Sequence, residues 1–442
     1  MPPVTLCGPN PFTVYGQIDA PTDGLGFSFR NAGDKAERDG GMTPHSSSKA
    51  CIMNDITTIT TTEALAAFCE KAKSEAYVTV DTEFLRERTY WSKLCLVQLA
   101  LPSHGAVEGD AVLVDPLVKG LSLEPLYDLF RHTGTVKVFH AARQDLEIFF
   151  TDANVFPDPL FDTQIAAMVC GFGEQVGYET LVRKIAKESL DKSSRFTDWS
   201  RRPLTPAQAK YAVADVTHLR VIYEYLAKQL AKSGREAWVR EEERIMLDPE
   251  TYINRPEDAW KRVKTRTHSG KFLAVVRELA RFREGYAQNK NIPRSRIFKD
   301  DAMLELASTK PQSLEELNRS RLLLREARKG DIAEGILQAV KEGLATPADK
   351  MPKPDVEKTQ LQVDSALADL LRVLLKAKST SAGVAPKLIA NSSDLDRIAA
   401  GKQDVAALKG WRHEVFGKDA LRLCTGEIAL AATNGQVRVV EV

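Results

Sequence analysis

The sequence predicts an α/β domain with a mixed sheet flanked by helices, followed by two small all-α domains. Between about residues 56 and 230, segments with the alternation typical of strands come first and then alternate with helical segments. Beyond about residue 264, apolar residues recur at helical spacing, and Pro and Gly separate short helices. A chain of 442 residues is also too long to fold around one compact core, which favours several domains.

The composition is that of a globular protein, with 43% hydrophobic and 27% charged residues. The six cysteines are scattered without a C-x-x-C pair, which argues against a zinc site or a disulfide framework and fits a reducing compartment. No apolar run approaches the ~20 residues of a membrane span, and the N-terminus lacks the layout of a signal peptide. We therefore expect a cytoplasmic protein without membrane association.

Composition shifts divide the chain into six segments. The first is rich in Gly, Pro, Ser and Asp without any period, and we expect it to be a disordered extension. The predicted segments are a disordered extension over 1–53, the α/β domain over 54–231, a charged connector over 232–263, a helical domain over 264–345, a linker over 346–360 and a second helical domain over 361–442.

The strand expected over 78–84 presents two carboxylates on one face. Side chains two positions apart on a strand point the same way, so Asp81 and Glu83 lie side by side. Two neighbouring carboxylates repel each other, and burial increases the cost. A divalent cation would neutralise both, whereas the alternative is a half-exposed strand with a solvated polar face.

The rest of the α/β domain supplies further acidic positions. Asp145 follows the strand expected over 135–140, and the junctions after such strands are where functional groups gather. Tyr211 and Asp215 are four apart on an expected helix and share a face, although an exposed pair is an alternative. The other expected elements are helices over 61–72, 123–131, 143–150, 178–188 and 206–228, strands over 94–100 and 111–115, and a strand passing into a helix over 161–168.

Asp-x-Glu on a strand, Asp after a later strand and Tyr-x-x-x-Asp on a helix together resemble the DEDD superfamily of 3′→5′ exonucleases. The chain is most similar to the ribonuclease D family, whose Tyr-containing third motif it shares. The resemblance spans about residues 56–230. It is carried by the blocks that begin at Asp81 (DTEFLRERTYWSKLCLVQL), His140 (HAARQDL), Asp162 (DTQIAA), Leu190 (LDKS), Thr197 (TDWSRRPL) and Tyr211 (YAVADV).

This resemblance implies an RNase H-like fold and hydrolysis with two divalent metal ions, Mg²⁺ or Mn²⁺, roughly 4 Å apart. Asp81 would bridge the ions, Glu83 and Asp215 would complete one of them, and Asp145 would hold the other. Tyr211 would orient the attacking water rather than act as a base, because the pKa of a tyrosine is ~10. The products would be nucleoside 5′-monophosphates.

Other residues are weaker candidates for substrate binding. Gln98 would face the terminal nucleotide or make a sheet hydrogen bond, and His140 would approach substrate or pack at a strand end. Lys192, Trp199 and Arg201 would hold phosphate or stack a base, with a core position as the alternative for the tryptophan. Asp162 is expected to cap a helix rather than bind metal. The stretch 86–91 would help to hold the RNA 3′ end.

The segment over about 264–344 resembles an HRDC domain, a helical nucleic-acid-binding module. Leu273–Glu284 and Asn291–Asp301 carry this resemblance, and the segment after Val363 is similar to a second, diverged copy. Residues 261–299 contain 12 Lys/Arg and 2 Glu, a local net charge of +10. Such a charge favours non-specific phosphate binding, although the basic residues could also solvate helices or dock against the first domain.

The resemblance therefore implies a 3′→5′ exoribonuclease that trims structured RNA such as tRNA precursors and acts as a monomer. Two alternatives stay open from the residues. The first is a DNA-directed 3′→5′ exonuclease, because the same carboxylates serve either sugar. The second is a non-catalytic nucleic-acid-binding protein, against which the complete set of Asp81, Glu83, Asp145, Tyr211 and Asp215 speaks.

Overall fold

The computed structural model describes residues 56–442 except 105–108, 192, 266, 268 and 354–361. The extension expected over 1–53 lies outside the described residues, as does Lys192. Within the part of the chain that the structure describes, no helix is long and apolar enough to cross a membrane.

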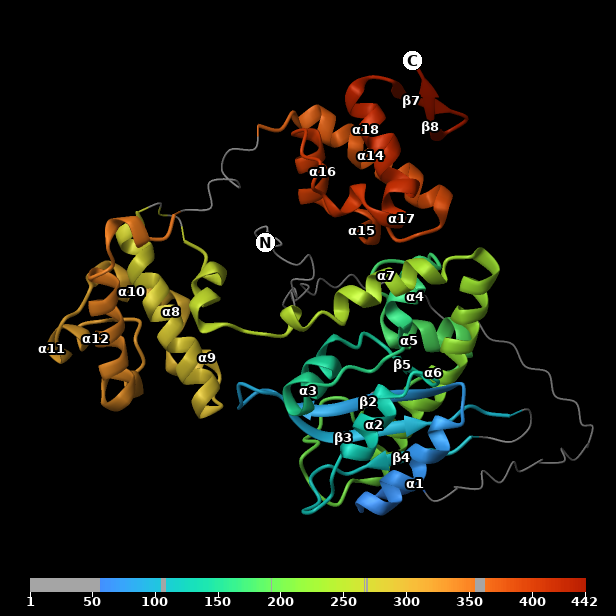
Figure 1. Cartoon of the computed structure of the whole chain (residues 1–442), viewed down its shortest axis with the longest axis horizontal. Coiled ribbons are helices and arrows are strands. Elements are labelled where there is room, and N and C mark those ends of the chain that lie inside the picture. The colour runs from blue at the N-terminus through green and yellow to red at the C-terminus, as the bar shows by residue number, and fades with distance from the viewer. Residues whose placement is uncertain (1–55, 105–108, 192, 266, 268, 354–361) are drawn as a thin grey trace, which may run out of the picture. The chain divides into compact units, whose positions relative to one another are not determined.

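The first domain is built on one mixed sheet of six strands, ordered β1-β4-β3-β2-β5-β6. Strand β2 runs antiparallel to β3 and parallel to β5, so the sheet joins an antiparallel meander to a parallel edge (Figure 1). This confirms the expected mixed sheet. The strands are β1 (Thr57–Ile59), β2 (Tyr77–Leu85), β3 (Lys93–Ala100), β4 (Ala111–Val114), β5 (Val136–Phe139) and β6 (Leu160–Asp162).

Helices cover both faces of this sheet. Val78 and Val80 of β2 pack in one hydrophobic cluster with residues of α1, α2 and α3, whereas Tyr77 packs in another with Leu219 of α6. The alternation along β2 therefore separates an apolar face from the face that carries the carboxylates. The helices are α1 (Thr62–Lys73), α2 (Glu124–Arg131), α3 (Arg143–Ala153), α4 (Thr163–Val169), α5 (Tyr178–Leu181) and α6 (Pro206–Ser233).

Sequence patterns missed two elements near this sheet. Strand β1 has three residues, too few to show a period, and it pairs in parallel with β4. The stretch expected as a connector contains helix α7 (Glu236–Met246), whose Val239 is buried. Two acidic side chains of α7, Glu242 and Glu243, are also buried, so this helix lacks a simple polar face.

The first helical domain forms its own hydrophobic cluster. Its long helix begins after Ser269, whose side chain accepts a hydrogen bond from the backbone of Phe272, and it ends at Asn291 in the left-handed conformation. The helices are α8 (Gly270–Lys290), α9 (Arg294–Ile297), α10 (Asp300–Thr309), α11 (Leu314–Leu317) and α12 (Gly330–Leu344).

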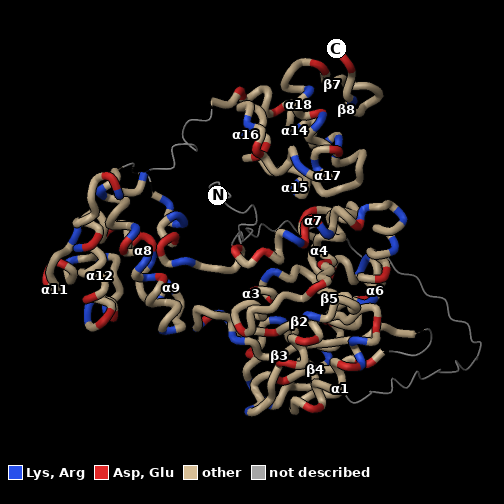
Figure 2. Tube along the Cα trace, viewed as in Figure 1, with Lys and Arg blue, Asp and Glu red and all other residues tan. Residues whose placement is uncertain are grey.

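Much of the positive charge counted over 261–299 is already paired. Basic and acidic residues are interspersed in this domain (Figure 2), and Arg283 makes an ion pair with Asp300 at 2.7 Å. The paired basic residues are Lys261, Arg262, Arg277, Arg281, Arg283 and Arg294. The exposed basic residues of this stretch that make no such ion pair among the described residues are Lys264, Lys271, Lys290, Arg296 and Lys299.

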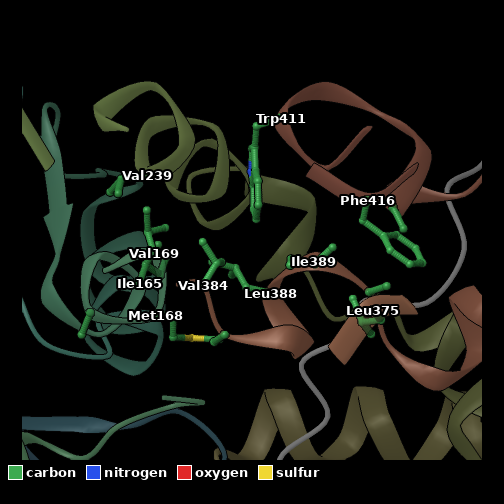
Figure 3. Close-up of a cluster of buried hydrophobic side chains, with 14 of the residues drawn as sticks. Ile165, Met168, Val169, Val239, Leu375, Val384, Leu388, Ile389, Trp411 and Phe416 are labelled. Atoms are coloured by element: carbon green, nitrogen blue, oxygen red, sulfur yellow. The ribbon is translucent and has the colours of Figure 1, made fainter. Parts of the chain in front are cut away.

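The C-terminal segment shares a hydrophobic cluster with α4, α6 and α7. Figure 3 shows Val384 and Leu388 of this segment beside Ile165 of α4. The all-α class expected for this segment is corrected at its end, where a short strand over 438–442 was the alternative: it forms an antiparallel hairpin of β7 (Ile428–Thr433) and β8 (Gln436–Glu441). Its helices are α14 (Ser365–Ala382), α15 (Pro386–Ile389), α16 (Ser392–Ala399), α17 (Gly410–Arg412) and α18 (Lys418–Thr425).

Candidate active site

The carboxylate face of β2 packs against α6. Thr79 lies on the same strand face as Asp81 and Glu83, and its hydroxyl donates a hydrogen bond to the backbone oxygen of Val216 at 2.8 Å. This contact ties β2 to the middle of α6. The two carboxylates that follow Thr79 on this face therefore project towards the part of the helix that carries Asp215.

Helix α6 supplies the third carboxylate. Thr205 and Gln208 form a capping box at its first turn, which fixes the start of the helix before Pro206. Asp215 then meets the strand carboxylates, because one oxygen from each of Asp81, Glu83 and Asp215 lies within 4.8 Å of the others. These three residues, predicted from a strand and a separate helix, form one cluster.

Asp145 lies beside this cluster in the first turn of α3. The hydroxyl of Thr82, the residue after Asp81, donates a hydrogen bond to the Asp145 carboxylate. Burial raises the pKa of Asp145 well above its usual range, and the charge of Asp81 raises this pKa further. Asp145 is therefore a close neighbour of the cluster, although it is not one of the three carboxylates within 4.8 Å.

The cluster concentrates negative charge in a poorly solvated place. Burial raises the pKa of Asp81 to about 6. Burial, reinforced by neighbouring carboxylates, raises the pKa of Asp215 to about 8 and that of Glu83 to about 10. Divalent cations such as Mg²⁺ and Mn²⁺ prefer oxygen ligands of this kind, and their charge would favour the ionised carboxylates. The donor set therefore fits such a cation.

A cavity of about 270 Å³ opens beside the carboxylates. Tyr211 lines it and hydrogen-bonds Asp215 one helical turn away. Burial raises the pKa of Tyr211, and the charge of Asp215 raises it further. The phenol therefore keeps its proton at neutral pH. Tyr178 also lines the cavity and donates its hydroxyl proton to the backbone oxygen of Asp215, which holds α6 in place.

Sequence reasoning missed Arg195, a basic residue that lines this cavity. Its positive charge opposes the increase in the pKa values of Glu83 and Asp215, so it acts on the cluster directly. Arg195 comes from the irregular stretch before α6, where no period marks a face. The only signal was its place two residues before Thr197, within the blocks that resemble the exonuclease family.

Two of the weaker candidates, Gln98 and His140, lie next to the site. Gln98 is the β3 partner of Asp81 and is fully buried. Among the described residues, neither amide atom of Gln98 has a hydrogen-bond partner, so the expected sheet hydrogen bond is absent there. His140 lines the cavity, its ring lies 3.0 Å from the hydroxyl of Thr163, and burial lowers its pKa.

The remaining candidates lie away from the cavity lining. Trp199 is 2% exposed and packs with Leu113 and Ala212, so its ring belongs to the core, the alternative that the sequence left open. Arg201 is exposed and forms an ion pair with Asp198 at 3.5 Å. Lys192 lies outside the described residues.

The stretch 86–91, expected to help hold the RNA 3′ end, is exposed over residues 86–88, whereas its two aromatic residues contact the first helical domain. Tyr90 is buried, and its hydroxyl donates to Glu284 of α8. The side-chain oxygen of Asn291 accepts hydrogen bonds from the backbone of Tyr90 and of Trp91, each at 3.0 Å. Arg86 instead forms an ion pair with Glu147. These aromatic residues therefore join β2 and β3 to the first helical domain.

Two family models match the chain. The model described as 3′-5′ exonuclease matches residues 56–231, and the model described as HRDC domain matches residues 272–340. The first range contains all of the clustered carboxylates, and the second falls within the first helical domain.

Curated relatives match nearly the whole described chain. Ribonuclease D of Jannaschia sp. (strain CCS1) is 62% identical over 385 residues, which are 87% of this chain and 99% of that protein. Ribonuclease D of Granulibacter bethesdensis is 47% identical over 87% of this chain and 96% of that protein. The crystal structure of Escherichia coli RNase D, described as an exoribonuclease involved in structured RNA processing, matches with a TM-score of 0.74. It is 29% identical, covering 84% of this chain and 99% of that one.

Proposed function

The chain belongs to the ribonuclease D family, and from this premise we propose that Asp81, Glu83, Asp145 and Asp215 form the active site with which it degrades RNA. The chain is a 3′→5′ exoribonuclease. The observation that supports this site best is the meeting of three carboxylate oxygens within 4.8 Å beside a cavity. Products of the reaction are nucleoside 5′-monophosphates released from the 3′ end.

The site depends on metal, and two ions, Mg²⁺ or Mn²⁺, suit the four carboxylates. When bound, such ions lower the pKa of a water and stabilise charge on the leaving 3′ oxygen. Asp81, Glu83 and Asp215 would hold the ions, and Asp145 from α3 would complete the set of ligands. Calorimetric titration of the metal-free protein with Mn²⁺ tests whether each chain binds two ions. A stoichiometry of one, or binding unchanged in Asp81→Asn, would contradict it.

Two residues of the cavity act on substrate. Tyr211 keeps its proton because its pKa is raised, so its hydroxyl orients the attacking water as a hydrogen-bond donor rather than removing a proton. Arg195 places a guanidinium in the same cavity, where it can bind the phosphate being cleaved. The protein thus supplies an orienting group and an anion-binding group.

The helical HRDC domain binds RNA without sequence specificity through the exposed basic residues between positions 261 and 299. The ion pairs within the domain leave Lys290 and Arg296 exposed close together in the chain, near the end of α8. Reversing both to Glu should flatten the salt dependence of RNA binding, by about 0.7 in log–log slope for each lost phosphate contact. The matched reversal of Lys329 and Lys341 should change it little. Equal effects of the two pairs would contradict this role.

We place the activity on tRNA precursors and other structured RNA 3′ ends in the cytoplasm, where such precursors mature in bacteria. The chain acts as a monomer in this proposal, since one chain supplies Asp81, Glu83 and Asp215 together. Light scattering during gel filtration, with and without RNA, checks this. A stable dimer required for activity would contradict it.

Matched RNA and DNA strands test the substrate class. With Mn²⁺, the protein should shorten a 5′-labelled RNA stepwise from its 3′ end and should leave the matched DNA largely intact. Chromatography should identify nucleoside 5′-monophosphates. Faster digestion of DNA would favour the DNA-directed alternative, and nucleoside 3′-monophosphates would contradict the proposed chemistry.

A further inference from the structure

The turn between β5 and α3 has a strained backbone. Ala141 has a φ of 57°, in the left-handed region that residues with a Cβ rarely adopt. Helix α3 begins two residues later at Arg143, and Asp145 lies in its first turn. The direction in which Asp145 points therefore depends on a conformation that Ala141 disfavours by itself.

The Asp162 carboxylate holds this turn from across the sheet edge. One of its oxygens, Oδ2, accepts a hydrogen bond from the backbone of Ala142 at 2.8 Å, and Oδ1 accepts one from Ala141 at 3.2 Å. Oδ1 also caps α4 by accepting from the backbone of Gln164 at 2.7 Å and Ile165 at 3.3 Å. Hydrogen bonds to an ionised carboxylate are stronger than neutral ones, so these can maintain a disfavoured turn.

Asp162 is itself firmly placed. It is 1% exposed and pairs with Phe139, the last residue of β5, in the parallel register of the sheet. Its backbone nitrogen donates to Glu243 of α7 at 2.7 Å. The next residue, Thr163, donates its hydroxyl proton to the Phe139 backbone oxygen at 3.0 Å. The carboxylate that holds the turn is therefore fixed to the sheet on which the active site is built.

We propose that Asp162 is a positioning residue for Asp145, holding the strained Ala141 turn so that the first turn of α3 presents Asp145 to the metal site. Asp162 acts through backbone N–H groups of the turn and not as a metal ligand. The inference rests on the metal-binding role proposed above for Asp145. The sequence predicts Asp162 only as a helix cap. Capping explains two of the four backbone hydrogen bonds that the side chain accepts, and the other two come from the turn.

The substitution Asp162→Asn removes one of the two hydrogen bonds that hold the turn. An amide keeps one oxygen, which can still cap α4 and accept from Ala141, but it directs an NH₂ group at the Ala142 N–H, where it cannot accept. Calorimetric titration with Mn²⁺ should show affinity weakened 10–100-fold, the range typical of lost outer-shell contacts. The matched control is Asp364→Asn, which alters another helix-capping aspartate, on α14, and should leave the affinity unchanged.

The side chain of Ala141 is exposed, so substitutions at this position test the role of the turn without changing any charge. Ala141→Val, a β-branched residue at positive φ, should weaken Mn²⁺ binding although Asp162 is intact. Adding Ala141→Gly to Asp162→Asn should restore most of the affinity, because glycine adopts the turn without strain. An unaltered affinity in Ala141→Val, or no rescue by glycine, would contradict a role through the turn. The valine variant also keeps the inference testable if Asp162→Asn does not fold.

Asp145→Asn distinguishes this inference from the function on which it rests. If Asp145→Asn binds Mn²⁺ as tightly as the unaltered protein, the metal role of Asp145 is wrong and the inference falls with it. If Asp145→Asn weakens binding but Asp162→Asn does not, the inference alone is wrong. Far-UV circular dichroism and cooperative thermal unfolding establish that each variant is folded.

Discussion

Without metal, the active site should destabilise the fold, so replacing one of its carboxyl groups should stabilise the protein. Glu83 is the carboxylate to change, because its pKa is raised to about 10 from an ordinary value of 4.5. At pH 7, about 2.5 pH units above this ordinary pKa, the side chain is ionised in the unfolded chain and must take up a proton on folding. At about 1.4 kcal/mol per unit, this costs about 3 kcal/mol.

Two other estimates agree with this magnitude. Two unit charges 4.8 Å apart, the limit within which the carboxylate oxygens lie, repel by about 3 kcal/mol at an effective dielectric constant of about 20. The increase in the Asp81 pKa from 3.8 to about 6 corresponds to a similar free energy. Glu83→Gln should therefore raise the free energy of unfolding of the metal-free protein by up to about 3 kcal/mol, or roughly 6–12 °C in Tm.

The stabilisation should depend on pH with a defined sign. The folded protein binds a proton at Glu83 more tightly than the unfolded chain, so its stability falls as pH rises above the unfolded pKa of 4.5 towards the folded value of about 10. The advantage of Glu83→Gln should thus be near zero at pH 4.5 and should grow by about 1.4 kcal/mol per pH unit. Urea unfolding in EDTA at several pH values measures it.

Metal should reverse the effect. Saturating Mn²⁺ should stabilise the unaltered protein more than Glu83→Gln, which has lost a ligand. The control is Glu87→Gln on the same segment, where the side chain is exposed and the change should stay within about 0.5 kcal/mol. A Glu83→Gln variant that is less stable in EDTA at pH 8, or an advantage that does not vary with pH, would refute the reasoning.

Three further substitutions test neighbours of the cluster. Tyr211→Phe should lower kcat by about 10²-fold or more without weakening Mn²⁺ binding, and an equal loss in metal affinity would contradict an orienting role. Arg195→Ala should raise KM for RNA by about 10–100-fold, as expected for a lost charge-assisted hydrogen bond, and an effect confined to kcat would exclude phosphate binding in the ground state. Gln98→Met should stabilise the protein by about 1 kcal/mol in urea unfolding, because it removes a buried amide without a partner among the described residues; a loss of stability would mean that the amide is bonded.

The catalytic elements could be predicted because their patterns are local. The alternation along β2 placed Asp81 and Glu83 on one face, and the four-residue spacing on α6 placed Tyr211 and Asp215 on another. The meeting of the two faces, however, depends on Thr79 binding the backbone of α6, a contact between distant segments. The resemblance to a nuclease family supplied that pairing before the structure did.

Other features could not be predicted, for physical reasons. Arg195 lies in an irregular stretch where no period indicates a face. Helix α7 buries Glu242 and Glu243, so its polar residues resembled those of a connector. Tyr90 lies in the stretch expected to help hold the RNA 3′ end, but its hydrogen-bond partner Glu284 is nearly 200 residues away in the sequence. Each of these depends on tertiary contacts rather than on local periodicity.

The most direct test of the active site is hydrolysis of a 5′-labelled RNA by Asp81→Asn in the presence of Mn²⁺, beside the unaltered protein. The unaltered protein should produce a ladder shortened from the 3′ end. Asp81→Asn should leave the RNA intact while binding it with nearly the same Kd in a filter assay, because the exposed basic residues of the helical domain are unchanged. Metal-dependent shortening that persists in Asp81→Asn would show that these carboxylates are not the active site.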